Sequence, residues 1–141
     1  MKIAMILDKP FPPDPRVENE AVTLVESGHE VHLFSLDYEN RKSFEIINGI
    51  NVHRFEFSSY LRKKIVPLLF KIPIYHWLLK SKVEAFIDKF DFNVIHVHDL
   101  EIAGLIFKIN KKKRLPLILD LHENKPEIMK NYTHVNSFLG R

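Results

Sequence analysis

The sequence KIAMILDKPFPPDPRVENEAVTLVESGHEVHLFSL, residues 2–36, contains the pattern on which the fold depends. Residues 2–8 form an apolar run that ends in an aspartate, which is typical of a buried strand. Residues 9–15 contain four prolines, which exclude a helix or a central strand. From an Asp-Pro start, apolar residues then recur at helical spacing as far as Gly28. A second apolar run over residues 30–36 completes a predicted strand–helix–strand unit.

The same alternation continues along the rest of the chain. Asn48-Gly49 lies between two apolar runs and favours a tight hairpin turn, because both turn positions require a positive φ. The predicted elements are a hairpin over 44–47 and 50–57, a mainly helical stretch over 60–90 whose most regular part is 82–90, strands at 93–99 and 116–121, and helices at 100–110 and 123–131. This order predicts an α/β fold, with a mostly parallel sheet, helices on both faces and one β-hairpin.

The composition excludes several classes of protein. The 141 residues suit a single domain over 1–141. The absence of cysteine removes disulfides and thiolate metal sites, and the four glycines lie too far apart for a phosphate-binding glycine loop or a Gly-x-Ser-x-Gly elbow. A net charge of +3 without a long basic run gives no reason to expect a nucleic-acid partner. The longest apolar stretch, residues 65–79, contains a lysine and two prolines and is too short to span a bilayer.

Ligands of parallel sheets bind beyond the carboxyl ends of the strands, so the polar residues there are candidates for a binding site. Asp14 and Arg16 open the first predicted helix, where backbone N–H groups and the guanidinium would bind an anion or the hydroxyls of a sugar. The structural alternative is ordinary helix capping by Asp14, with Arg16 paired to Glu20.

A group of polar residues closes the predicted strand at 93–99. His96 and His98 share one face of this strand, and Asp99 points to the other if the strand continues. Metal sites usually draw ligands from more than one element, and the sequence indicates no third ligand, so we predict no metal and interpret His96 as a core histidine bonded to a neighbouring backbone group. His98 and Asp99, at the end of the strand, are predicted to face a ligand.

The last predicted strand is followed by His122 and Glu123. A histidine at this position would bond a substrate hydroxyl or exchange a proton near neutral pH. The alternative is that Glu123 caps the next helix and that His122 only fills space. Asp120 lies within an otherwise apolar strand and is expected to bond a nearby backbone group or a histidine.

Residues 60–82 combine cations with an aromatic, apolar stretch. Arg62, Lys63 and Lys64 precede it, and Trp77 lies near its end. This pattern is typical of contact with an anionic membrane surface. The alternative is a helix that packs on the sheet and keeps its lysine tips in water.

Six segments, in order and spread over most of the chain, resemble the N-terminal domain of GT-B glycosyltransferases of the family 4 type. They are Lys-Ile-Ala-Met-Ile-Leu-Asp (2–8), Asp-Pro-Arg-Val-Glu-Asn-Glu-Ala (14–21), Glu-Ser-Gly-His-Glu-Val (26–31), Asn-Gly-Ile-Asn-Val-His-Arg (48–54), Val-Ile-His-Val-His-Asp (94–99) and Leu-Asp-Leu-His-Glu-Asn-Lys-Pro-Glu (119–127).

The resemblance implies a Rossmann-like, doubly wound domain that forms the acceptor-binding N-terminal half of a GT-B enzyme. Such an enzyme moves a sugar from a nucleotide-sugar donor to a glycan or lipid-linked acceptor, with retention of configuration and without a metal or other cofactor. By the same resemblance, His122 is the catalytic residue beside the donor sugar. The acceptor side would include Asp14, Arg16, His98, Asp99 and Glu123.

The sequence departs from the family pattern at two points, and both affect the function that we expect. Pro12-Pro13 replaces the Gly-Gly pair of many relatives, and residue 141 falls before the end expected of an N-terminal domain, with no donor-binding domain. We therefore expect a domain incomplete at its C-terminus and inactive without a donor-binding domain, supplied as a missing or separate chain. The alternatives are a non-catalytic sugar- or membrane-binding subunit, a fragment, or half of a GT-B-like sugar-nucleotide epimerase. The expected location is the cytoplasm, with attachment to the cytoplasmic membrane face as the variant.

Overall fold

The computed structural model describes residues 1–58 and 74–121. The strands are β1 (Lys2–Leu7), β2 (Glu30–Asp37), β3 (Phe44–Ile47), β4 (Ile50–Glu56), β5 (Val94–His98) and β6 (Leu117–Asp120), and the helices are α1 (Pro15–Glu26), α3 (Ile74–Lys89) and α4 (Leu100–Lys113). They form one sheet in the order β3-β4-β2-β1-β5-β6, in which only β3 and β4 pair antiparallel. The predicted α/β class, with its mostly parallel sheet and single hairpin, is confirmed.

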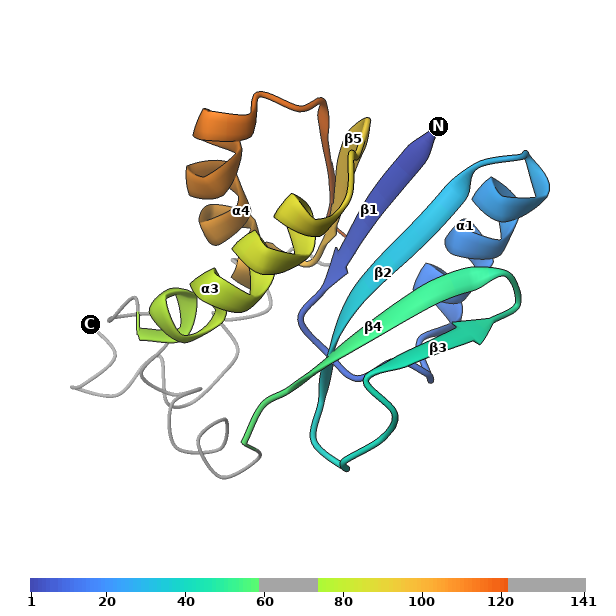
Figure 1. Ribbon diagram of the computed structural model, residues 1–141, viewed down its shortest axis with the longest axis horizontal. Helices are drawn as coiled ribbons and strands as arrows, with labels where there is room; N and C mark the ends of the chain where they lie inside the picture. Colours follow the sequence, from blue (N-terminus) through green and yellow to red (C-terminus); the bar gives the residue numbers. More distant parts are fainter. Residues whose placement is uncertain (59–73, 122–141) are drawn as a thin grey trace, which may run out of the picture.

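Helix α1 lies on one face of the sheet, and α3 and α4 lie on the other (Figure 1). The two faces are filled by alternate residues of the same strands, as the two-residue period of a strand requires. In β1, Ala4 and Ile6 belong to the core beneath α3 and α4. Met5 and Leu7 belong to the core beneath α1. Strand β1 is therefore buried on both faces, which explains its uninterrupted apolar sequence.

The start of α1 follows from its sequence. Asp14 has an extended backbone and its Oδ1 accepts a hydrogen bond from the Val17 N–H at 3.4 Å, while Pro15 occupies the first helical position. A proline costs nothing there, because the N–H that it lacks would have no partner within the helix. Val17 and Ala21 are the buried residues of the helix. The predicted N-cap is confirmed.

The hairpin also forms where the sequence predicts it. β3 and β4 are joined by Asn48 and Gly49, whose φ angles are 49° and 80°. Positive φ at both turn residues gives the turn the twist that matches the strands.

Helix α3 lies within the mainly helical stretch predicted over 60–90 and is longer than its most regular part, 82–90. It begins at Ile74 and continues unbroken to Lys89. Its buried residues are Leu79, Val83, Phe86 and Ile87, which share one face of the helix. The helix starts directly after a proline in the sequence, and a proline restricts the residue before it and not the helix after it. The predicted helix over 123–131 and residues 59–73 lie outside the described part of the chain.

The segment between β1 and α1 is fastened to the neighbouring strands. The Leu36 N–H donates to the Lys9 carbonyl at 3.1 Å. Arg54 Nε donates to the Phe11 carbonyl at 3.0 Å, and Arg41 Nη1 donates to the Pro12 carbonyl at 2.9 Å. These three bonds hold the proline-rich segment at the carboxyl end of the sheet. None of the helices within residues 1–58 and 74–121 has the length and hydrophobicity that crossing a bilayer requires.

Candidate functional site

Four aspartates gather where the parallel strands end, and we call them the carboxyl edge. They are Asp8 after β1, Asp37 at the end of β2, Asp99 after β5 and Asp120 at the end of β6. The register pairs Leu7 with His98 and His98 with Asp120, so the ends of β1, β5 and β6 are level with one another. Asp8, Asp37 and Asp99 are buried. The edge matches the place where parallel sheets bind ligands, and β1 lies at the point where the strand order reverses.

Lys9 provides a positive charge at this edge. Its Nζ forms an ion pair with Asp99 Oδ2. Burial by itself would lower the pKa of Lys9, but the hydrogen bond and charge of Asp99, with the charges of Asp8 and Glu101, hold that pKa above its ordinary value. Lys9 therefore stays charged at the carboxyl edge.

Asp99 has an unusual backbone. Its φ is 74° and its ψ is 151°, a combination that is almost restricted to glycine and costs a residue with a side chain about 1–3 kcal/mol. Asp99 is the residue before α4, but its side chain makes no capping hydrogen bond and instead pairs with Lys9. β5 ends at His98, so the condition under which Asp99 was expected to point to the other face of the strand is not met.

Asp37 is held by Arg41. Arg41 Nε donates to Asp37 Oδ1 at 2.7 Å and the Arg41 N–H donates to Oδ2 at 2.8 Å. Burial would raise the pKa of Asp37, but these hydrogen bonds outweigh it and hold the pKa below the ordinary value. Asp37 is thus an ionised anchor for the segment after β2, and Arg41 connects it to Pro12.

Asp14 and Arg16 lie together at the start of α1. Arg16 Nη2 donates to Asp14 Oδ2 at 3.2 Å. The alternative pairing of Arg16 with Glu20 is therefore wrong, because the guanidinium turns back over the helix start instead of along the next turn. Asp14 acts as the cap that the sequence predicted, and the Arg16 side chain keeps 41% of its surface exposed. An exposed guanidinium next to a helix N-terminus is suited to an anionic or hydroxylated ligand.

His96 and His98 face α1, with ring centroids 4.3 Å apart. His96 Nε2 and His98 Nδ1 each lie 3.8 Å from Glu20 Oε2, and His98 Nδ1 lies 3.7 Å from Asp120 Oδ2. The His96 side chain is 14% exposed and lies beside a carboxylate of α1, and its expected bond to a neighbouring backbone group stays a prediction. His98 is fully buried, so it lies behind the carboxyl edge and not at its surface. Asp120 lies close to a histidine, as predicted.

Three residues at or near the site were not predicted as site residues from the sequence. Sequence reasoning did not assign Lys9 or Arg41 to the site, and it considered Glu20 only as a partner for Arg16. The available signal for Glu20 was its position beside Ala21, at the border of the buried stripe of α1. Other predicted site residues lie outside the described part of the chain, namely Arg62, Lys63, Lys64, His122 and Glu123.

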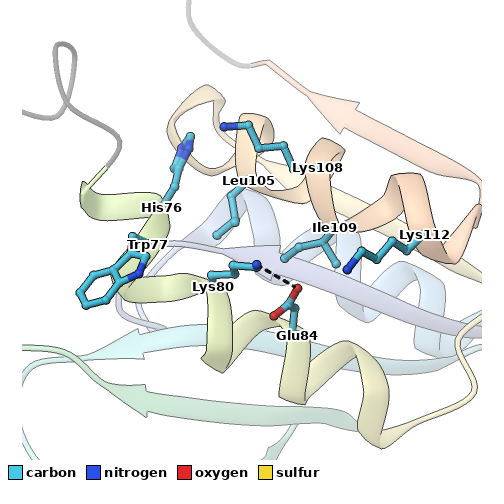
Figure 2. Close-up of a pocket in the computed structure, with 8 residues that line it drawn as sticks. All are labelled: His76, Trp77, Lys80, Glu84, Leu105, Lys108, Ile109 and Lys112. Atoms are coloured by element: carbon cyan, nitrogen blue, oxygen red, sulfur yellow. Dashed lines mark ion pairs between the residues drawn. The ribbon is translucent and has the colours of Figure 1, made fainter.

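A groove of about 280 Å³ lies between α3 and α4, and it shares no residue with the carboxyl edge. Figure 2 shows its lining, in which Leu105 and Ile109 are bordered by lysines and Trp77. Lys80 Nζ is 3.9 Å from Glu84 Oε1, one turn along α3 on the same side of the groove (Figure 2). Trp77 is 75% exposed, which is uncommon for so large an apolar side chain.

Comparison of the sequence with known families now adds to this geometry. The sequence profile described as Glycosyltransferase Family 4 matches residues 16–140, which is most of the chain. The protein belongs to glycosyltransferase family 4. No curated protein matches the sequence of this family 4 chain at a significant level.

Solved structures show the same fold. A sucrose-phosphate synthase (tll1590) from Thermosynechococcus elongatus matches this family 4 chain with a TM-score of 0.65 and 12% identity, over 97% of this chain and 37% of that one. A second sucrose-phosphate synthase structure from the same organism matches with a TM-score of 0.62 and 14% identity, over 92% of this chain and 68% of that one. The chain thus spans little more than a third of the length of the first relative. The fold is that of an N-terminal GT-B glycosyltransferase domain.

Proposed function

We propose that this family 4 chain is the acceptor-binding half of a glycosyltransferase. The observation that supports the proposal is that two ion pairs follow the carboxyl ends of parallel strands: Lys9 with Asp99 at the carboxyl edge, and Arg16 with Asp14 at the start of α1. Carboxylates accept hydrogen bonds from sugar hydroxyls, and a guanidinium donates to hydroxyl or phosphate oxygens. The edge therefore offers both kinds of partner to a hydroxylated acceptor.

The proposed chemistry assigns different tasks to different parts. Asp14, Arg16 and Asp99 would orient the acceptor, with His98 supporting Asp99 from behind and Glu123 adding a further carboxylate. His122 would lie beside the donor sugar. In glycosyl transfer from a nucleotide sugar, negative charge develops on the departing diphosphate, and preorganised positive groups are the main means of stabilising it. We assign that task to a donor-binding domain, and we expect this chain alone to perform no transfer.

Binding at the carboxyl edge can be tested by nuclear magnetic resonance. A panel of free hexoses, N-acetylhexosamines and their phosphates would be titrated into isotope-labelled protein. We expect shifts at the amides of Lys9, Arg16 and Asp99, and binding that is about ten-fold weaker in Arg16→Gln, since a charge-assisted hydrogen bond contributes about 1.5–3 kcal/mol. Glu26→Gln is the control, because Glu26 is exposed and is the last residue of α1, at the opposite end of the helix from Arg16. Shifts confined to the groove between α3 and α4 would contradict the proposal.

An activity assay distinguishes the proposed acceptor-binding half from a chain that catalyses transfer by itself and from half of an epimerase. The purified chain would be incubated with UDP-glucose, GDP-mannose or UDP-N-acetylglucosamine together with the sugars that bind. We expect neither transfer nor release of nucleotide. Sustained transfer would overturn the assignment of the leaving-group site to another domain. A 2-epimer formed from UDP-N-acetylglucosamine would favour the epimerase alternative.

A membrane surface is the second candidate partner, and the exposed Trp77 favours it. Trp77 borders a groove that also contains Lys80, Lys108 and Lys112. Tryptophan prefers the headgroup level of a bilayer, and each lysine near an anionic surface contributes about 1 kcal/mol. We place the protein, on this proposal, at the cytoplasmic face of a membrane, with Arg62, Lys63 and Lys64 as additional contacts.

Vesicle co-sedimentation tests the membrane proposal. We expect binding to phosphatidylglycerol vesicles that weakens with salt, and negligible binding to phosphatidylcholine. Trp77→Ala, and separately a triple change of Arg62, Lys63 and Lys64 to glutamate, should reduce binding several-fold. Lys42→Glu is the matched control, because this exposed lysine is remote from α3. Equal binding to both kinds of vesicle would exclude an anionic surface as the partner.

A further inference from the structure

The fold brings Glu20 and Asp120 to His96 and His98, which the sequence did not indicate, and against the expectation of no metal we propose that these four residues bind a divalent transition-metal ion, with Zn²⁺ as the best fit. The four residues come from three elements, since Glu20 is on α1, the two histidines are on β5 and Asp120 is on β6. One ligand atom from each residue can be chosen so that all four lie within 4.8 Å of one another. The proposal is independent of the acceptor-binding role.

The distances between the ligand atoms fit one small ion. Zn²⁺ binds nitrogen and oxygen at about 2.0–2.2 Å, so neighbouring ligands in a tetrahedral site are about 3.4 Å apart. Glu20 Oε2 is 3.8 Å from both His96 Nε2 and His98 Nδ1, and His98 Nδ1 is 3.7 Å from Asp120 Oδ2. No pair of the four ligand atoms is more than 4.8 Å apart, so side-chain shifts of up to about 1 Å would close the site around an ion.

The ligand chemistry selects the kind of metal. Two imidazoles and two carboxylates suit Zn²⁺, Co²⁺ or Mn²⁺, whereas Mg²⁺ and Ca²⁺ prefer oxygen ligands alone. The two carboxylates balance the charge of a divalent ion, which reduces the cost of holding it in a partly buried place. The exposed fractions of the side chains, 36% for Glu20 and 24% for Asp120 against 0% for His98, give an ion access from the side of the carboxylates.

The ion would serve the structure and not the transfer reaction. It would tie α1 to β5 and β6, next to the start of α4 and directly behind Asp99. In this arrangement His98 is a metal ligand that fixes the end of β5. A network held by hydrogen bonds alone is the competing arrangement, and it predicts no dependence on metal.

Metal binding can be tested on the whole chain, prepared without a histidine tag and stripped with a chelator. Zn²⁺, Co²⁺ and Mg²⁺ would each be added alone. We expect one Zn²⁺ per chain by elemental analysis after desalting, a rise in Tm with Zn²⁺, visible absorption typical of tetrahedral Co²⁺, and no effect of Mg²⁺. Nitrogen shifts of the His96 and His98 rings, and not of the His29 ring, would identify the ligands.

Variants make the test specific. Glu20→Gln and His96→Gln should each weaken Zn²⁺ binding by about 10–100-fold, while His29→Gln should leave it unchanged. Glu20→Gln keeps the size of a side chain on the outer part of α1, so it remains informative if a histidine variant fails to fold. The proposal is overturned if the stripped chain retains no Zn²⁺, or if all three variants bind it as tightly as the wild type.

Discussion

Gly49 is the residue at which backbone and packing constraints coincide. Its φ is 80°, and a Cβ built on it would lie 2.8 Å from Val25 Cγ1 on α1. In Gly49→Ala, the backbone of the alanine would therefore be strained, and its Cβ would also displace the Val25 side chain. We expect the free energy of unfolding to fall by about 2–3 kcal/mol, measured by urea denaturation.

Gly28→Ala is the matched control for that prediction. Gly28 has the same φ of 80°, but a Cβ there would meet nothing within 4 Å. Its cost should be the backbone strain alone, about 1–2 kcal/mol. Adding Val25→Ala to Gly49→Ala should recover the difference between the two. Equal costs for the two glycine variants would show that the hairpin turn moves away from α1 freely.

His53 is expected to make stability depend on pH. It stacks on His32 with ring centroids 5.2 Å apart and is 8% exposed. Burial, with the charges of His32 and Lys89, lowers the pKa of His53 to about 4. Between pH 6.5 and 4 the unfolded chain binds a proton that the folded chain does not, so stability falls as the pH falls, by at most about 1.4 kcal/mol per unit.

The contribution of His53 can be separated from that of other groups by His53→Gln. The Glu30 carboxylate accepts from His32 Nε2 at 2.8 Å, and His32 Nδ1 shares a hydrogen bond with His53 Nε2 at 3.0 Å. The side chain of glutamine can keep a hydrogen bond to His32 but cannot titrate. Urea denaturation between about pH 7 and about pH 4.5 should give a shallower decline for the variant. Parallel declines would assign the pH dependence to other groups.

For helices and strands, the sequence predicted the boundaries that depend on local residues, but it did not predict contacts between segments that are distant in the sequence. Asp14-Pro15 and Asn48-Gly49 each fix a helix start or a turn through their own backbone, so the sequence predicted α1 and the hairpin. The sequence also predicted a mainly helical stretch over 60–90, which contains α3, but it held no start signal there comparable to Asp14-Pro15. The grouping of Glu20 with His96 was not predictable, since it depends on how far α1 lies from β5.

Arg54 should act on an element that is distant in sequence. Its buried guanidinium donates to Glu45 Oε2 at 2.9 Å, to the Lys42 carbonyl at 3.0 Å and to the Phe11 carbonyl at 3.0 Å. Lysine cannot reproduce three directed bonds. We expect Arg54→Lys to lower the free energy of unfolding by about 2–3 kcal/mol. It should also shift the amide resonances of the segment before α1.

Arg16→Lys is the control for Arg54→Lys. Arg16 is exposed and pairs with Asp14 within its own helix start, so its replacement should cost less than about 1 kcal/mol. If Arg54→Lys costs no more than that, or leaves the resonances of Phe11 unchanged, the fastening of the proline-rich segment depends on other contacts.

For the whole molecule, the burial of β1 on both faces determines which strands of the sheet resist local unfolding most. Ala4, Met5 and Ile6 are fully buried, and their backbones bond to β2 on one side and β5 on the other. Their amides should exchange hydrogen only when the whole domain unfolds. The amides of β3, which pairs only with β4 in the described sheet, should exchange at least about ten-fold faster in native-state exchange experiments. Equal rates would mean that the sheet opens as one unit.

The position of β1 also affects the chain while it is being made. Ile3 pairs with Val31 on one side and with Val94 on the other, so its second neighbour is synthesised roughly 60 residues after the first. At about 5–20 residues per second, the edge of β1 that pairs with β5 remains unpaired for a time on the order of 3–12 s. A ribosome-bound chain therefore presents an open strand of Ala, Met, Ile and Leu until β5 has been synthesised. During that interval, β1 is a suitable substrate for chaperones that bind extended apolar segments.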